Sequence, residues 1–290
     1  MTRVTLCSAK GSPGVTTLSC VLGAVWPADR AVVVAECDPS GGDLAGRFGL
    51  STRLGMTSLV LTERQAVMRT PDYRAHAQQL PGGLDVLVAP AGSDSAVALD
   101  RELGMSTSDI VPPDCDLLAD CGRLVPGAVG QEKMIRAADG VVLLVRPDVA
   151  GVAHARWATS RINELSSSIP YAVVVGTGTY EAAEVAEELD VNVLGAVPFD
   201  PSAALMACGS PGTARRFIRS GLVAFAREMV TALIRGWPND PPRDRGLGKR
   251  EQMSQALEGR DLLNERLSSV PRVSRQRQVR GDERTPAASP

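Results

Sequence analysis

The stretch from Lys10 to Thr17 reads K-G-S-P-G-V-T-T and has the residue types that phosphate binding requires. Its two glycines let backbone N–H groups curl around phosphate oxygens, and the hydroxyl of Thr16 can hold Mg²⁺. An apolar run precedes this stretch and a helix-forming segment follows it, so the positive end of a helix dipole would meet the same phosphates. The order of strand, glycine-containing loop and helix therefore predicts a phosphate-binding loop.

The apolar segments of the chain are spaced as in an α/β protein. Seven short runs are mostly apolar without alternation, which is typical of strands buried on both faces, and stretches of helical length separate them. The pattern predicts an α/β fold with a three-layer, doubly wound sheet of mostly parallel strands and helices on both faces. The expected strands are 3–9, 31–38, 84–90, 115–120, 141–146, 171–176 and 192–198, and the expected helices are 16–25, 57–68, 127–138, 150–166, 181–189 and 213–234.

Length and composition fit one such domain followed by a tail. The chain has 290 residues, of which 44% are hydrophobic and 22% are charged. Residues 238–290 contain 6 of the 20 prolines and carry a net charge of +3, against −5 for residues 1–237. We expect a P-loop domain over 1–237 and a disordered or partly helical Pro/Arg-rich tail over 238–290. The acidic balance of residues 1–237 excludes a strongly basic domain.

The sequence indicates neither a signal peptide nor a transmembrane segment. No run of 18 residues is apolar and uncharged, and the chain reaches Lys10 before a signal-peptide core could form. The protein is therefore expected in the cytoplasm. The six cysteines show no C-x-x-C spacing, so we expect reduced, packed thiols rather than disulfides or a metal site.

The loop and four later blocks resemble the ParA/MinD family of deviant-Walker P-loop NTPases. That family's loop reads K-G-G-x-G-K-T-T, and its early "signature" lysine corresponds to Lys10. The later blocks follow in the family's order and cover the chain to about residue 235. They are A-V-V-V-A-E-C-D-P-S-G-G-D at 31–43, L-L-A-D-C-G at 117–122, A-A-D-G-V-V-L-L-V-R-P at 137–147 and L-G-A-V-P-F-D at 194–200.

The resemblance implies an ATP site with Mg²⁺. Asp38 would be a catalytic carboxylate that orients the attacking water or holds Mg²⁺ through water, and Lys10 would reach across a homodimer to the partner's phosphates. The implied metal ligands are Thr16, Asp38 and Asp120. The implied cofactor-binding residues are Lys10, Gly11, Ser12, Pro13, Gly14, Val15, Thr16, Thr17, Pro198 and Asp200.

Three positions depart from the family pattern. Val15 replaces the lysine that neutralises the β- and γ-phosphates, Pro13 removes one loop N–H, and Gly176 replaces an asparagine that reads adenine. A charge-assisted hydrogen bond contributes roughly 1.5–3 kcal/mol, so the change at Val15 predicts about 10- to 100-fold weaker nucleotide binding. Hydrolysis should fall further, because charge develops on the transferred phosphoryl group.

Two functions remain open at this point. The first is an ATP-binding dimer with weak or absent ATPase activity that positions a cellular cargo such as a chromosome, a plasmid or pilus or secretion machinery. The alternative is a pseudo-ATPase scaffold that docks unknown protein partners without nucleotide. A small-molecule enzyme on the same fold has less support, because neither His76 nor His154 has an obvious partner.

Nonspecific DNA binding is a further hypothesis. It would use the tail and three arginines at the start of the last expected helix, Arg215, Arg216 and Arg219. The same spacing also fits arginines on the solvated face of an amphipathic helix.

Overall fold

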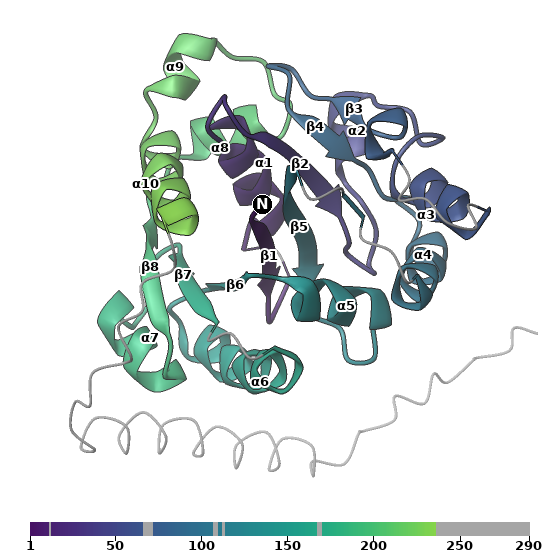
Figure 1. The fold of residues 1–290 in the computed structure, drawn as a ribbon. Helices are drawn as coiled ribbons and strands as arrows, with labels where there is room; N and C mark the ends of the chain where they lie inside the picture. The colour runs from purple at the N-terminus through teal and green to yellow at the C-terminus, as the bar shows by residue number, and fades with distance from the viewer. Residues whose placement is uncertain (12, 66–71, 107–109, 112–113, 167–169, 236–290) are drawn as a thin grey trace, which may run out of the picture. The chain divides into compact units, whose positions relative to one another are not determined.

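Eight strands form one sheet in the order β3-β4-β2-β5-β1-β6-β7-β8 (Figure 1). The computed structural model describes residues 1–11, 13–65, 72–106, 110–111, 114–166 and 170–235. All neighbouring strands run parallel except β3, which pairs antiparallel with β4. The strands are β1 (Arg3–Ser8), β2 (Ala31–Glu36), β3 (Gln78–Gln79), β4 (Asp85–Leu87), β5 (Cys115–Arg123), β6 (Gly140–Val145), β7 (Tyr171–Val175) and β8 (Asn192–Val197).

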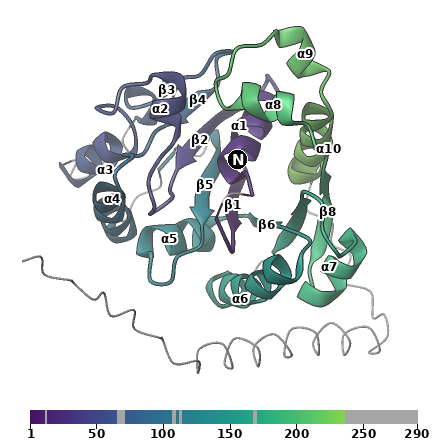
Figure 2. The same ribbon diagram turned by 180° about the vertical axis from the view of Figure 1, so that it is seen from behind.

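Helices cover both faces of the sheet, as Figures 1 and 2 show. On one face α1 packs against α8 and α10, and on the other face α3 to α7 follow one another. All six residues of β6 are buried, as a strand between two helical layers requires. The helices are α1 (Val15–Ala24), α2 (Leu44–Phe48), α3 (Met56–Gln65), α4 (Ser93–Met105), α5 (Val129–Ala137), α6 (Val149–Leu165), α7 (Ala182–Leu189), α8 (Pro201–Ala207), α9 (Ala214–Ile218) and α10 (Gly221–Arg235), with a 3₁₀ turn η1 at Tyr73–Ala75.

The expected α/β sheet with helices on both faces is confirmed, and the last expected helix is corrected. The segment 213–234 contains two helices, α9 and α10, because the helical conformation is interrupted at Arg219 and Ser220. The hydroxyl of Ser220 accepts the backbone N–H of Val223 at 3.2 Å and so caps the second helix. Arg215 and Arg216 therefore lie on a separate short helix, with Arg219 at its end.

The tail expected over 238–290 lies outside the described residues. Within the described residues, no helix combines the length and the apolar character needed to span a bilayer. All six cysteines are free thiols, and five of them are buried.

Candidate nucleotide-binding site

The loop between β1 and α1 ends on a glycine with a left-handed backbone. Gly14 caps α1 with a φ of 93°, a left-handed conformation that side-chain-bearing residues rarely adopt. The N–H of Leu18 donates to the carbonyl of Gly14 at 2.9 Å, which closes the first helical turn. Lys10 and Gly11 are exposed on the loop, whereas Ser12 lies outside the described residues. The described part of the loop is thus open to a ligand and leads directly into a helix N-terminus.

The side chains at the start of α1 point to three different surroundings. Val15 is 4% exposed and belongs to the hydrophobic core. Thr16 lies beside the carboxylate of Asp120 and lowers its pKa. Thr17 lies 3.4 Å from the Sγ of Cys208, the residue that ends α8. Of the three, Thr16 occupies the position expected of a metal ligand.

Asp120 lies near the carboxyl end of β5, between β1 and β2, and is 2% exposed. Burial raises its pKa to about 7, and the nearby charges of Glu36 and Asp38 act in the same direction. Hydrogen bonds from Thr16 and from the N–H of Gly122 lower it only in part. A cation beside Asp120 would relieve the buried negative charge.

Asp38 lies in the loop after β2, against the end of β5. Its carboxylate accepts the N–H of Ser40 at 2.7 Å, and the nearby backbone of Arg123 lowers its pKa. Gly122 has a φ of 53°, and a Cβ at this position would overlap the Asp38 carboxyl group. Burial raises the pKa of Asp38. The structure therefore brings Thr16, Asp38 and Asp120 to one edge of the sheet.

The chemistry of this donor set fits Mg²⁺, which prefers oxygen ligands and uses one or two protein groups together with phosphate and water. In the parts of the chain that the structure describes, no three His, Cys, Asp or Glu side chains are grouped so that they could hold a metal ion by themselves. A hydroxyl and two carboxylates beside a phosphate loop suit a metal that arrives with a nucleotide.

The chain is similar to known proteins in sequence and in fold. No protein-family model matches the chain. An uncharacterized ATP-binding protein of Methanocaldococcus jannaschii is 27% identical over 215 residues, which cover 68% of this chain and 74% of that protein. Among solved structures, a ParA family ATPase from Chlorobium tepidum has a TM-score of 0.60 at 14% identity, with 80% of this chain and 99% of that chain covered. The septum site-determining protein MinD from Pyrococcus horikoshii, in complex with Mg-ADP, has a TM-score of 0.58 at 15% identity, with 79% and 95% covered.

The chain has the fold of the ParA/MinD ATPases. This likeness confirms the fold expected from the five blocks.

Glu36 lies at this ParA/MinD-like edge, and the sequence analysis assigned it no role. Its carboxylate is buried at the end of β2 and accepts three backbone N–H groups, from Asp43 at 2.7 Å, Leu44 at 2.9 Å and Ala89 at 3.0 Å. Burial raises its pKa, and these three bonds lower it. Glu36 thus fixes both ends of the Asp38 loop. An acidic residue that ends an apolar strand, two positions before Asp38, was the available signal.

Arg47 of α2 connects the same loop to α8. Its guanidinium donates to Asp43 at 2.6 Å and to the Sγ of Cys208 at 3.4 Å. Because Cys208 also contacts Thr17, one thiol joins the helix after the Asp38 loop to the helix of the phosphate loop.

Pro198 and Asp200, expected beside the base, follow the end of β8. The carboxylate of Asp200 accepts the N–H of Ala203 at 3.0 Å and caps α8, and Pro201 occupies the first turn of that helix. Phe199 between them is 85% exposed. Asp200 therefore has a structural role here, and an aromatic ring is left free beside it.

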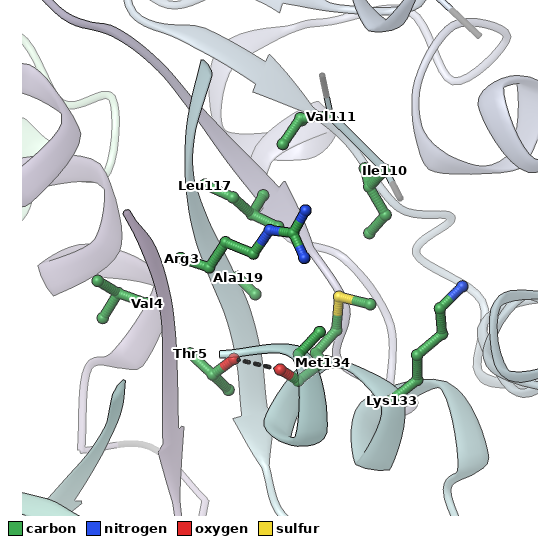
Figure 3. A pocket seen from close by; sticks show the side chains of 10 residues that line it. Arg3, Val4, Thr5, Ile110, Val111, Leu117, Ala119, Lys133 and Met134 are labelled. Carbon is green, nitrogen blue, oxygen red and sulfur yellow. Dashed lines mark hydrogen bonds between the residues drawn. The ribbon is translucent and has the colours of Figure 1, made fainter. Parts of the chain in front are cut away.

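A small cavity lies at the opposite, amino end of β1 (Figure 3). Its volume is about 20 Å³, room for about one water molecule. The hydroxyl of Thr5 donates to the carbonyl of Met134 at 3.0 Å beside it. The cavity is too small for a nucleotide and is separated from the phosphate loop by the length of the strand.

Proposed function

We propose that this chain is a ParA/MinD-type protein that binds ATP with Mg²⁺ at the Lys10–Thr17 loop. The observation that carries the proposal is that Thr16, in the first turn of α1, lies beside the buried carboxylate of Asp120 and lowers its pKa. The chain's similarity to an ATP-binding protein and to MinD in complex with Mg-ADP supports the proposal.

The residues of the site would have different roles. Thr16 and Asp120 would hold Mg²⁺, the backbone of Gly11 and Gly14 would face phosphate oxygens, and Asp38 would orient a water molecule. Bound ATP would supply the phosphoryl group. Because Val15 provides no cation, turnover would be slow or absent.

The proposal includes a nucleotide-dependent homodimer in the cytoplasm that positions a cellular cargo. Lys10 is exposed on the loop, so its side chain would reach across the dimer and contact the phosphates bound by the partner subunit. The P-loop domain would end near residue 237. DNA binding through Arg215, Arg216 and Arg219 would require α9, whose residues are largely exposed.

Two measurements test the proposal. Titration calorimetry with ATP and Mg²⁺ should give saturable binding that Asp120→Ala abolishes, and sedimentation should show a dimer only with nucleotide. Lys10→Ala should remove the dimer and leave a monomer that still binds ATP. A chain that binds no ATP at millimolar concentration would overturn the proposal.

The second candidate is a scaffold that docks protein partners without nucleotide. Val15 favours this scaffold function, because its apolar side chain is buried in the core and gives the loop no positive charge for a phosphate. Under this alternative the same titration shows no heat of binding, and the oligomeric state does not respond to ATP.

A further inference from the structure

A cavity of about 230 Å³ lies beside the phosphate loop, toward β6. It brings together residues of the loop with residues of the β6–α6 connection. Its lining residues are Lys10, Gly11, Pro13, Leu144, Val145, Arg146, Asp148, Ala150 and Gly151.

We propose that Arg146 binds the phosphates of the nucleotide and supplies the positive charge that Val15 does not. This inference rests on the proposed nucleotide binding and adds a residue from outside the loop. Arg146 directly follows β6, and β6 is the neighbour of β1 in the sheet, with Ser8 beside Leu144. Parallel strands bring their carboxyl ends to one edge, so Arg146 and Lys10 line the same cavity.

The Arg146 side chain contacts Asp148 through its Nε, while its terminal nitrogens are open to a ligand. Its Nε lies 3.4 Å from Oδ2 of Asp148, and the other carboxylate oxygen accepts the N–H of Gly151 at 2.7 Å. Gly151 also leaves no room for a Cβ against the carbonyl of Arg146, so the first turn of α6 packs closely on this residue. Among the described residues the guanidinium has no other ion pair or hydrogen bond, and 63% of the side chain is exposed. Its two terminal nitrogens can therefore meet a ligand.

The charges around the cavity favour an anion. Within a single chain, before any dimer forms, Lys10 and Arg146 contribute two positive charges and Asp148 one negative charge, which leaves a net charge of +1. Lys10 makes no ion pair within the described part of the chain. A guanidinium can bind a phosphate through two parallel hydrogen bonds, which a single ammonium group cannot do.

The test compares Arg146→Ala with Arg136→Ala in the full chain. Arg136, on α5, is the matched control because its side chain is 53% exposed and it also pairs with a nearby carboxylate. Titration with ATP and Mg²⁺, and separately with inorganic pyrophosphate, should show about 10-fold weaker binding or more for Arg146→Ala. Arg136→Ala should bind like the parent, and Arg146→Lys should fall between them because it keeps the charge but not the paired bonds.

A rescue experiment separates charge supply from a structural role. In a Val15→Lys background, the loss caused by Arg146→Ala should shrink to about 3-fold or less, because the loop then has its own cation. A parent chain that binds ATP but is unaffected by Arg146→Ala would overturn the role of Arg146 and leave the proposed function standing. Equal losses for Arg146→Ala and Arg136→Ala would overturn it as well. A parent chain that binds neither ATP nor pyrophosphate would overturn both.

Discussion

Glu36 and Asp120 stand side by side near the carboxyl ends of β2 and β5, where the strand register pairs them directly. Two buried carboxylates in neighbouring strands repel one another, and their surroundings determine which of them stays charged. Glu36 accepts three backbone N–H groups, whereas Asp120 accepts one, from Gly122. Burial raises the pKa of both carboxyl groups, and Glu36, with more donors, is the better stabilised anion of the pair.

Replacing Glu36 by alanine should destabilise the chain by about 2–4 kcal/mol, because three backbone N–H groups lose their acceptor. The loss is partly offset because a buried charge and its repulsion with Asp120 disappear. Urea unfolding measures the effect. Glu164→Ala is the control, since Glu164 is 62% exposed in an i,i+3 pair with Arg161, and it should cost under about 0.5 kcal/mol. Equal costs for the two variants would contradict the bracing role of Glu36.

Without Mg²⁺, stability should fall as the pH rises from about 4 to about 8. The pKa of Asp120 is about 7 in the folded chain against an ordinary value of 3.8, so the folded state keeps a proton that the unfolded state has lost. Raising the pH through this window removes about 2–4 kcal/mol of stability. Asp120→Asn should flatten this dependence and be more stable than the parent at pH 8. Urea unfolding at pH 5 and pH 8 decides, and an Asn variant that keeps the parent's full pH slope would contradict the assignment.

Gly122→Ala should lose more stability than Gly127→Ala. Both glycines have positive φ, 53° and 79°, but a Cβ at Gly122 would overlap Asp38 while Gly127 has open space around it. We expect a cost of about 1 kcal/mol for Gly127→Ala from backbone strain alone, and about 3 kcal/mol or more for Gly122→Ala. The melting temperatures of the two variants, measured by thermal unfolding, test this difference in stability. Similar melting temperatures would mean that Asp38 moves away from Gly122 at little cost.

Val15→Lys should tighten ATP binding by about 10-fold and lower the stability of the nucleotide-free chain. The new amine restores a charge-assisted contact, but position 15 is 4% exposed in the core, where an ammonium group is unfavourable without a phosphate partner. Val15→Met is the control, because it adds comparable length without charge and should leave ATP affinity unchanged. Calorimetry and thermal unfolding report the two effects separately. Equal affinities for the Lys and Met variants would show that the missing cation is not the defect.

The sequence predicted the sheet better than the helices. Each of the seven continuous apolar runs contains a strand, because residues such as those of β6 are buried on both faces and must be apolar throughout. Helix α4 was missed although Ala96, Leu99 and Leu103 form its buried stripe. The stripe also includes Asp100, whose carboxylate accepts the N–H of Gln131 at 2.9 Å, and a buried acid hides the helical pattern.

Some site residues can be identified from their neighbours in the sequence, whereas others depend on contacts with residues far along the chain. Gly14 and Thr16 stand out in the sequence through their neighbours in the loop, and in the structure Thr16 lies beside Asp120. The role of Glu36 depends on the N–H of Ala89, 53 positions away, which no local pattern encodes. The contribution of Arg146 likewise depends on β6 lying next to β1.

Cys208 joins three helices that are far apart in the sequence, through Thr17 of α1 and Arg47 of α2. The thiol is the weakest hydrogen-bonding group at this edge, so these contacts can break and re-form at little cost in free energy. A displacement of α1 or of α2 relative to α8 would therefore break a contact of Cys208 and leave the other helices in place.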